Sequence, residues 1–218
     1  MTKKRIGVLV SGSGSNLQAL IDSFSHSDTG EIIVVISDRR EAFGLKRAAK
    51  AQIEGIYLPK KKGTSREDYD KRLADALAAR DVEWIVCAGF MKILGNGFVQ
   101  KWRHKIINIH PAILPSFPGT DAVAQALNAG VRVTGATVHF VDEGTDTGPI
   151  IAQSALAVSH SDSLDSLKAK VLATEHRLLP MAVKWAVEGR LSVIDGRVCI
   201  AEQCSSEATI IDPIDTGS

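Results

Sequence analysis

An asparagine and a histidine lie two residues apart at the end of an apolar segment. The run Lys105 to Ile109 predicts a buried strand. Asn108 lies within this run, and His110 follows it directly. Side chains alternate along a strand, so these two point to the same face. An amide donor and an imidazole aimed at one place can hold and protonate a developing oxyanion. A histidine at a strand end is also a common structural feature, and both interpretations stay open.

A loop rich in carboxylates follows the predicted strand that contains His139. Residues 142–149 read DEGTDTGP, with Asp142 and Asp146 among the carboxylates. A carboxylate from this loop that reached His110 would favour the protonated ring. The spacing matches no zinc or calcium motif, so no metal is predicted. On composition alone, a solvated acidic turn is the simpler interpretation.

The segment after His110 is rich in proline. Pro111, Pro115 and Pro118 stiffen residues 111–119. The bond between Leu114 and Pro115 is a candidate for the cis form. A stiff segment at a strand end can hold a neighbouring side chain in place.

A loop rich in glycine and serine, SGSGSN at residues 11–16, lies between the first strand and the first helix. Its amides and the helix start favour an anion such as phosphate. A dinucleotide site would have a third glycine where Leu17 stands, although Asp38 lies where a ribose-binding acid would be. A P-loop would require Gly-Lys-Ser/Thr, which the chain lacks here. The remaining interpretation is a plain strand–helix turn.

Three further features have to be weighed between a functional and a structural interpretation. Met91 to Leu94 follow a predicted strand and can line an apolar pocket or belong to the ordinary core. Glu175 and His176 lie on a predicted long helix, where such a polar pair is typical of a solvent-facing surface. His139 lies within a strand, where it can be a packed residue or can support the site.

Apolar and amphipathic segments alternate along the chain. Strands are predicted at 6–10, 31–37, 55–58, 84–88, 105–109, 131–141 and 150–158, and a hairpin at 191–200. Helices are predicted at 16–24, 42–50, 64–80, 121–128 and 163–188, with Pro180 expected to kink or break the last one. This order predicts an α/β fold with a Rossmann-like, mostly parallel twisted sheet, helices on both faces, and antiparallel strands toward the C-terminal half.

The composition narrows the class of protein. The chain has 218 residues, of which 44% are hydrophobic and 23% are charged, as expected for a globular protein with a sizeable core. The net charge of +1 gives no global attraction to nucleic acid, and no apolar run approaches the length of a membrane span. Three cysteines without metal spacing, and no signal-peptide pattern, favour the cytoplasm. We expect one domain over 1–203 and a flexible tail over 204–218.

Seven blocks of sequence, in order and spacing, resemble the folate-dependent formyltransferases that act on glycinamide ribonucleotide. They are SGSGSNLQAL (11–20), AFGLKRA (42–48), SREDYD (65–70), AGFMKIL (88–94), INIHPAILPSFPG (107–119), HFVDEGTDTGPII (139–151) and ATEH (173–176). The resemblance implies the formyltransferase fold. It also implies transfer of the formyl group of 10-formyltetrahydrofolate to the amine of 5-phosphoribosyl-glycinamide, in de novo purine biosynthesis, without a metal.

The resemblance also implies roles for matching positions. The catalytic residues would be Asn108, His110 and Asp146. The ribonucleotide phosphate and glycinamide would be bound by Gly12, Ser13, Gly14, Ser15, Asn16 and Glu175. The folate would contact Arg66, Met91, Lys92, Ile93, Leu94, Asn108, Val141, Asp142 and Asp146. Thr137 and His139 would support the site. The family more often has Arg where Lys92 stands, which matters little if backbone groups make that contact.

Other functions share parts of this pattern. A formyltetrahydrofolate hydrolase would use water as nucleophile, and a methionyl-tRNA formyltransferase would need an RNA-binding domain. The residues 11–16 favour a phosphorylated small acceptor over both. A nucleotide-binding oxidoreductase or a phosphate-binding module could use Gly12, Gly14 and Asp38, but neither explains the other three residues, Asn108, His110 and Asp146. We expect small-molecule partners, and neither nucleic acid nor a membrane. A homodimer stays open, because the family includes both monomers and dimers.

Overall fold

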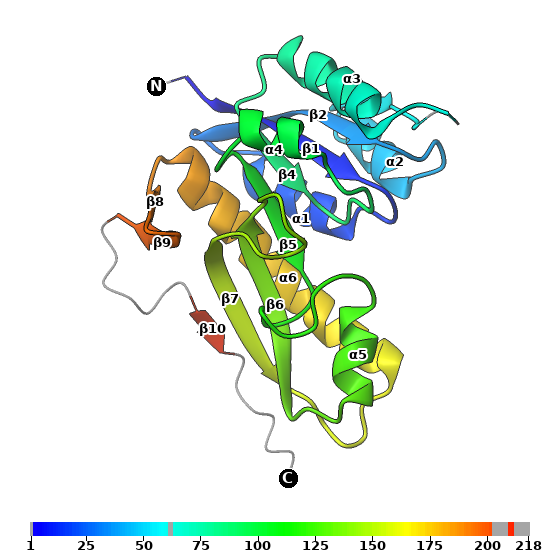
Figure 1. Cartoon of the computed structure of the whole chain (residues 1–218), viewed down its shortest axis with the longest axis vertical. Helices are drawn as coiled ribbons and strands as arrows, with labels where there is room; N and C mark the ends of the chain where they lie inside the picture. The colour runs from blue at the N-terminus through cyan, green and yellow to red at the C-terminus, as the bar shows by residue number, and fades with distance from the viewer. Residues whose placement is uncertain (1, 61–62, 202–208, 212–218) are drawn as a thin grey trace.

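The computed structural model describes residues 2–60, 63–201 and 209–211. This part of the chain forms an eight-stranded sheet in the order β10-β7-β6-β5-β4-β1-β2-β3 (Figure 1). The strands are β1 Lys4–Val10, β2 Gly30–Ser37, β3 Glu54–Tyr57, β4 Trp84–Cys87, β5 Ile106–His110, β6 Val133–Phe140, β7 Ile150–Ala157 and β10 Thr209–Ile211. Strands β1 to β5 are parallel, whereas β6 is antiparallel to both β5 and β7. The fold is therefore the expected α/β arrangement.

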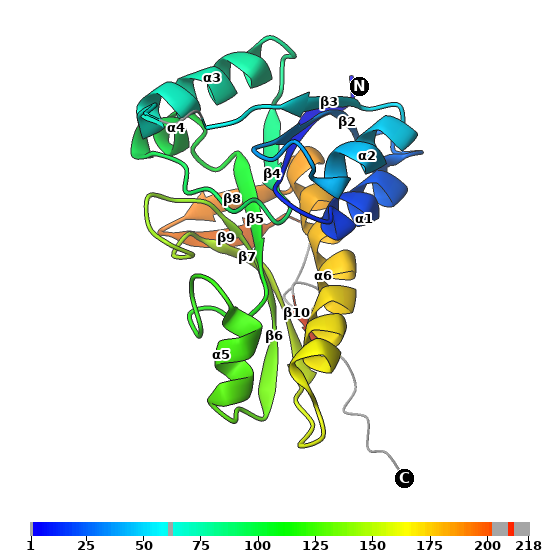
Figure 2. The same cartoon turned by 90° about the vertical axis from the view of Figure 1, so that its right-hand side faces the viewer.

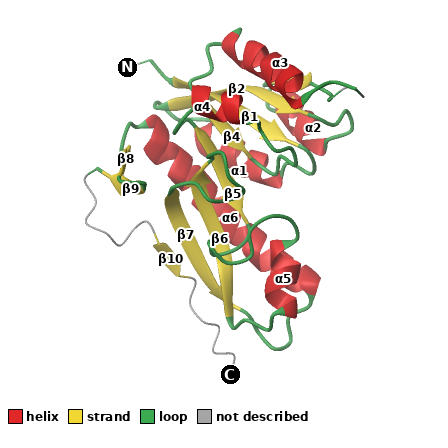
Figure 3. Ribbon diagram, viewed as in Figure 1, coloured by secondary structure: helices red, strands yellow, loops and turns green. Residues whose placement is uncertain are grey.

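Helices cover both faces of the sheet, as Figure 2 shows. They are α1 Ser15–Phe24, α2 Phe43–Lys50, α3 Arg66–Ala78, α4 Asn96–Lys101, α5 Ala122–Asn128 and α6 Leu164–Val187. Helices α1, α2 and α6 lie on one side, and α3 and α4 lie on the other. The short strands β8 Leu191–Ile194 and β9 Arg197–Ile200 form a separate hairpin (Figure 3).

Local sequence explains why these elements begin and end where they do. All four residues of β4 are buried, which fits a short apolar run in the middle of a parallel sheet. The hydroxyl of Ser65 accepts a hydrogen bond from the amide of Asp68 and caps α3. In the hairpin, Asp195 and Gly196 both have positive φ, as a two-residue turn of this kind requires.

The structure differs from the sequence-based expectation in three places. Helix α6 continues unbroken through Pro180, because Leu178, Leu179, Ala182 and Val183 anchor it in the core on both sides of the proline. The short helix α4 was not predicted. Part of the expected flexible tail, Thr209–Ile211, pairs with β7 as strand β10, while 204–208 and 212–218 lie outside the described residues.

The topology brings distant segments to one edge of the sheet. Because β1, β4 and β5 are parallel, the residues that follow them lie at the same edge. These are the loop at 11–16, the segment 88–95 and the segment 111–119.

Among the described residues, no helix is long and apolar enough to cross a membrane.

Candidate active site

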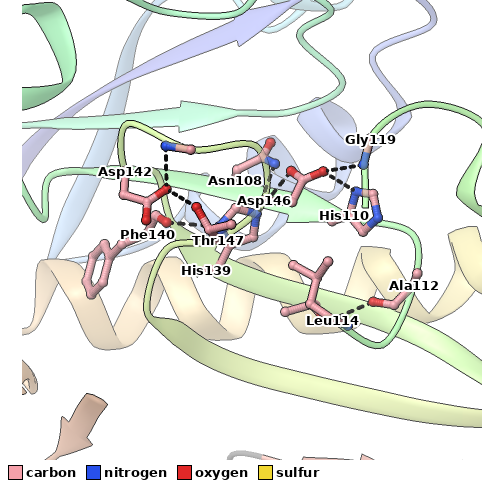
Figure 4. A network of polar contacts seen from close by, with 12 residues as sticks. Asn108, His110, Ala112, Leu114, Gly119, His139, Phe140, Asp142, Asp146 and Thr147 are labelled. Atoms are coloured by element: carbon pink, nitrogen blue, oxygen red, sulfur yellow. Dashed lines mark hydrogen bonds and ion pairs between the residues drawn. The ribbon is translucent and has the colours of Figure 1, made fainter. Parts of the chain in front are cut away.

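Asn108 and His110 lie at the end of β5, on the same face of the sheet. In the pairing of β5 with β6, Asn108 lies opposite His139 and His110 lies opposite Thr137. The intervening Ile109 points to the other face, into the core formed with α6. The alternation expected from the sequence therefore places these four polar side chains on one face. Figure 4 shows Asn108, His110 and His139 close together.

Asp146 lies between two histidine rings. Its Oδ2 is 3.3 Å from Nδ1 of His110, and its Oδ1 is 3.6 Å from Nε2 of His139. Asp146 adopts a left-handed backbone conformation with φ 55°, which an aspartate tolerates better than most residues. The amide of Gly119 donates to its Oδ2 at 2.8 Å. A single carboxylate thus joins residues from β5, β6 and two loops.

The surroundings of Asp146 keep its carboxyl group ionised. Burial alone would raise the pKa. The hydrogen bond with His139, the amide of Gly119 and the charges of the two rings outweigh burial, so the pKa of Asp146 is lowered. The negative charge at this position therefore persists at neutral pH.

Both ring nitrogens of His110 face hydrogen-bond acceptors. Nε2 lies 2.8 Å from the carbonyl oxygen of Phe117, and Nδ1 faces Asp146. A histidine satisfies two acceptors only when both nitrogens carry a proton. The geometry therefore suits an imidazolium ring. This is the state expected from the sequence if a carboxylate of the 142–149 loop reached His110, and Asp146 does so.

His139 faces two groups that suit different protonation states. Its Nδ1 donates to the carbonyl oxygen of Phe140 at 2.9 Å. Its Nε2 lies 3.2 Å from Nδ2 of Asn108 and 3.6 Å from Asp146. The neutral ring can accept from the amide of Asn108, and the protonated ring can donate to Asp146. His139 is thus buried but chemically coupled to the site.

A hydroxyl on β6 holds the proline-rich segment against the sheet. Oγ1 of Thr137 donates to the carbonyl of Ala112 at 2.7 Å and accepts from the amide of Leu114 at 3.0 Å. Gln153 on β7 donates to both Thr137 and the carbonyl of Leu114. The Leu114–Pro115 bond is cis, as the sequence allowed.

Asp142 shapes the acidic loop from within. Its Oδ1 accepts from the amide of Gly144 and from the hydroxyl of Thr147. Gly148 lies so close to Phe140 that an added Cβ would be within 2 Å of the carbonyl oxygen. The loop is therefore a defined structure. The solvated-turn interpretation is wrong for Asp146, which faces His110, and holds for Glu143 and Thr145, which are exposed.

The loop at 11–16 has features that a plain turn does not need. Gly14 precedes α1 with φ 67°. Ser11 donates to Asp38 at 2.6 Å and accepts from the amide of Met91 at 2.9 Å, so it ties this loop to the segment after β4. Because Asp38 is engaged by Ser11 and Leu17 is fully buried, the geometry disfavours a dinucleotide site.

Asn16 and Glu175 join the loop to α6. Nδ2 of Asn16 donates to Oε2 of Glu175 at 2.9 Å, and both side chains are buried. The expectation of a solvent-facing polar pair is therefore wrong for Glu175. Burial raises the pKa of Glu175 to about 7, although the hydrogen bond from Asn16 opposes this rise.

The segment Met91 to Leu94 presents apolar side chains to solvent. Met91 and Ile93 are each 66% exposed, whereas Leu94 is buried. Lys92 pairs with Asp38 at 3.6 Å. Two large exposed apolar side chains beside a polar site are typical of a surface that binds a ligand, and the ordinary-core interpretation holds only for Leu94.

Helix α3 secures the end of this segment. Asp70 accepts a hydrogen bond from the amide of Gly95 at 2.7 Å, and the stem of Arg66 lies against the same glycine. Val141 packs on the core at the start of the acidic loop. In the described ranges, no three His, Cys, Asp or Glu side chains gather in an arrangement suited to a metal ion.

A family model described as "Formyl transferase" matches residues 4–183. The chain belongs to the formyl transferase family. Phosphoribosylglycinamide formyltransferase of Haemophilus influenzae is 39% identical over 193 residues, which cover 88% of this chain and 91% of that protein. A trifunctional purine biosynthetic protein adenosine-3 of Drosophila pseudoobscura pseudoobscura is 46% identical over 87% of this chain. This chain spans only 14% of that larger protein.

Solved structures of the formyl transferase family share the fold. The phosphoribosylglycinamide formyltransferase of Anaplasma phagocytophilum has a TM-score of 0.89 and 39% identity, over 97% of this chain and all of that one. A formyltetrahydrofolate deformylase of Pseudomonas syringae has a TM-score of 0.83 and 29% identity, over 91% of this chain and 66% of that one.

Several groups in this candidate site were not found from the sequence. The carbonyl of Phe117 and the amide of Gly119 are backbone groups, which no motif reveals. Gln153 did leave a signal, because it interrupts the apolar strand IIAQSALA. Asp70 lies in a quoted block, but its contact with Gly95 depends on the packing of α3 against the segment before α4.

Proposed function

We propose that this protein transfers the formyl group of 10-formyltetrahydrofolate to the amine of 5-phosphoribosyl-glycinamide. The products are formylglycinamide ribonucleotide and tetrahydrofolate, and the step belongs to de novo purine biosynthesis in the cytoplasm. The observation that carries the proposal is the position of Asp146 between His110 and His139, beside Asn108. The name of the full-length Haemophilus influenzae relative supports the choice of acceptor.

The loop at 11–16 and α6 would bind the acceptor. Free N–H groups at the start of α1, together with the hydroxyls of Ser13 and Ser15, suit the phosphate. Glu175, next to Asn16, provides a carboxyl group for the glycinamide end. This assignment explains why the carboxyl group of Glu175 is buried and hydrogen-bonded to Asn16 of the same loop.

The folate would lie along the segment after β4. Met91 and Ile93 offer exposed apolar side chains, and Leu94 and Val141 pack in one hydrophobic cluster of the core. Arg66, at the start of α3, supplies a cation for the acidic end of the molecule. Asp142 holds the 142–149 loop in shape, so its contribution to folate binding is through the backbone of that loop.

The chemistry would begin when the amine nitrogen forms a bond to the formyl carbon. Asn108 and protonated His110 donate to the carbonyl oxygen as it gains negative charge, an effect of about 3 kcal/mol per donor. The contact of His110 with Asp146 is longer than its contact with Phe117, so Nδ1 is the nitrogen that exchanges partners. Phe117 meanwhile keeps the ring in place.

Asp146 would act as the proton acceptor of the reaction. Its ionised carboxylate faces His110 and accepts the proton that the amine loses, directly or through water. When the oxyanion reforms the carbonyl group, the bond between the formyl carbon and N10 breaks. That nitrogen takes up the proton that Asp146 accepted, and tetrahydrofolate leaves. No net proton is consumed, and both reactants are held in one site, which supplies orientation.

The similarity to a deformylase favours a second candidate, hydrolysis of 10-formyltetrahydrofolate. In that reaction, water replaces the amine, and Asn108, His110 and Asp146 act in the same way. The two reactions differ in the need for a phosphorylated acceptor, which the 11–16 loop and Glu175 would bind.

The deciding experiment mixes the protein with 10-formyltetrahydrofolate, with and without glycinamide ribonucleotide, and follows the deformylated folate. Turnover that requires the nucleotide supports the transferase. Turnover without the nucleotide supports the hydrolase. No turnover by folded protein in either mixture contradicts both.

A further inference from the structure

Helix α2 contacts both the 11–16 loop and the helix α1 that follows it. The amide of Gly44 donates to the carbonyl of Gly12 at 3.2 Å. Nε of Arg47 donates to the carbonyl of Ser13 at 2.9 Å, and its Nη1 donates to Gln18 on α1 at 3.1 Å. Two successive carbonyl groups of the loop are thus fixed toward α2.

These contacts determine where the following amides point. In a trans peptide, the carbonyl of one residue and the N–H of the next lie on opposite sides of the bond. The Gly12–Ser13 and Ser13–Gly14 peptides are both trans. With the carbonyls of Gly12 and Ser13 held by α2, the N–H groups of Ser13 and Gly14 point away from α2. In the described part of the chain, neither N–H donates to another group.

The two helices approach closely at this point, and only glycine permits it. An added Cβ on Gly14 would lie 2.6 Å from Cα of Gly44. An added Cβ on Gly44 would lie 2.9 Å from Cγ2 of Val10, on β1. Residue 44 must therefore be small for its amide to reach Gly12.

We propose that Gly44 and Arg47 are positioning residues that preset the amides of Ser13 and Gly14 for the ribonucleotide phosphate. The inference rests on the proposed function, because it takes the phosphate of the acceptor as the anion. Arg47 acts through the carbonyl of Ser13, and the phosphate is held by backbone N–H groups together with the first turn of α1. The loop is thereby organised before substrate arrives, so less order has to be created on binding.

The test compares Arg47→Met with Lys46→Met. Lys46 is the exposed neighbour on the same helix, so the control loses the same charge without touching the loop. We expect Arg47→Met to raise both the KM for glycinamide ribonucleotide and the Kd for inorganic phosphate about fivefold. The kcat and the KM for 10-formyltetrahydrofolate should stay within about twofold, and the control should match wild type.

Two further measurements separate positioning from a direct or a general structural role. With the dephosphorylated acceptor, glycinamide ribonucleoside, Arg47→Met and wild type should have the same KM. In amide NMR spectra of the free proteins, the resonances of Ser13 and Gly14 should move in Arg47→Met and stay in place in Lys46→Met. Unchanged resonances, or an equal loss with the nucleoside, would overturn the proposal.

Phosphate binding distinguishes this inference from the proposed function. If wild type binds inorganic phosphate and Arg47→Met weakens that binding, the inference holds even when no formyl transfer occurs. If wild type transfers the formyl group while Arg47→Met binds phosphate equally well, the inference fails and the proposed function stands.

Discussion

Thr137 lies directly opposite His110 in the antiparallel pairing of β6 with β5. The hydroxyl of Thr137 holds Ala112 and Leu114, at the start of the segment that leads to Phe117. The carbonyl of Phe117 in turn accepts the hydrogen bond from His110. A single cross-strand pair therefore fixes the ring and also the loop that orients the ring.

Replacement of Asp146 by asparagine should lower kcat by about 10²- to 10⁴-fold. The amide keeps the size of the side chain but removes the negative charge that faces His110 and His139. Steady-state kinetics measures the loss, and thermal unfolding checks that the fold persists. Glu143→Gln is the matched control, because Glu143 lies in the same loop and pairs only distantly with Arg103. A kcat near that of wild type in Asp146→Asn would remove Asp146 from the mechanism.

Glu175 should make the stability of the protein depend on pH. Burial raises the pKa of Glu175 from its ordinary 4.5 to about 7. The contribution of Glu175 to the free energy of unfolding is therefore full below pH 4.5, and it is lost as the pH rises through 7. Between pH 5 and pH 8, wild type should lose roughly 2 kcal/mol in its free energy of unfolding relative to Glu175→Gln. Urea unfolding at several pH values measures the difference. Parallel curves for the two proteins would show that Glu175 does not titrate in this range.

Much of this site could be predicted from the sequence, for physical reasons that differ by residue. Strand alternation placed Asn108 and His110 on one face, and the structure confirms that geometry. The burial of Glu175 could not be predicted, because its partner Asn16 lies 159 residues away and only the packing of α1 on α6 brings them together.

Backbone conformation and close packing account for the remaining differences. Asp146 contacts His110 from a left-handed backbone conformation. Such a conformation at a residue other than glycine could not be predicted from the local sequence. Helix α6 survives Pro180 because its flanking residues are buried, so tertiary packing outweighs the local preference. The blocks shared with the family supplied the candidate residues, and the fold explains how they meet.

Replacement of Gly14 by alanine should destabilise the protein by about 2 kcal/mol or more. Gly14 has φ 67°, and its new Cβ would lie 2.6 Å from Cα of Gly44. Gly12→Ala is the matched control, because a Cβ there meets no atom within 4 Å. The free energy of unfolding in urea should fall only in Gly14→Ala. Equal losses in the two variants would mean that the approach of α2 to the loop is not what requires a glycine.

Replacement of Thr137 by valine should destabilise the protein by about 2 kcal/mol and also lower kcat. Valine has nearly the same shape but leaves the buried amide of Leu114 and the carbonyl of Ala112 without their partner. The loop that carries Phe117 and Gly119 would then hold His110 and Asp146 less firmly. Urea unfolding measures the stability, and kinetics with both substrates separates kcat from KM.

Thr134→Val on the same strand is the control for that comparison. Thr134 is also buried, but its hydroxyl has no hydrogen-bond partner among the described residues. Its replacement removes an unsatisfied polar atom, so stability should stay the same or rise, and kcat should not change. Similar losses in Thr134→Val and Thr137→Val would mean that the hydrogen bonds of Thr137 do not organise the site. A loss of stability in Thr137→Val with unchanged kcat would mean that the hydrogen bonds of Thr137 stabilise the fold but do not affect catalysis.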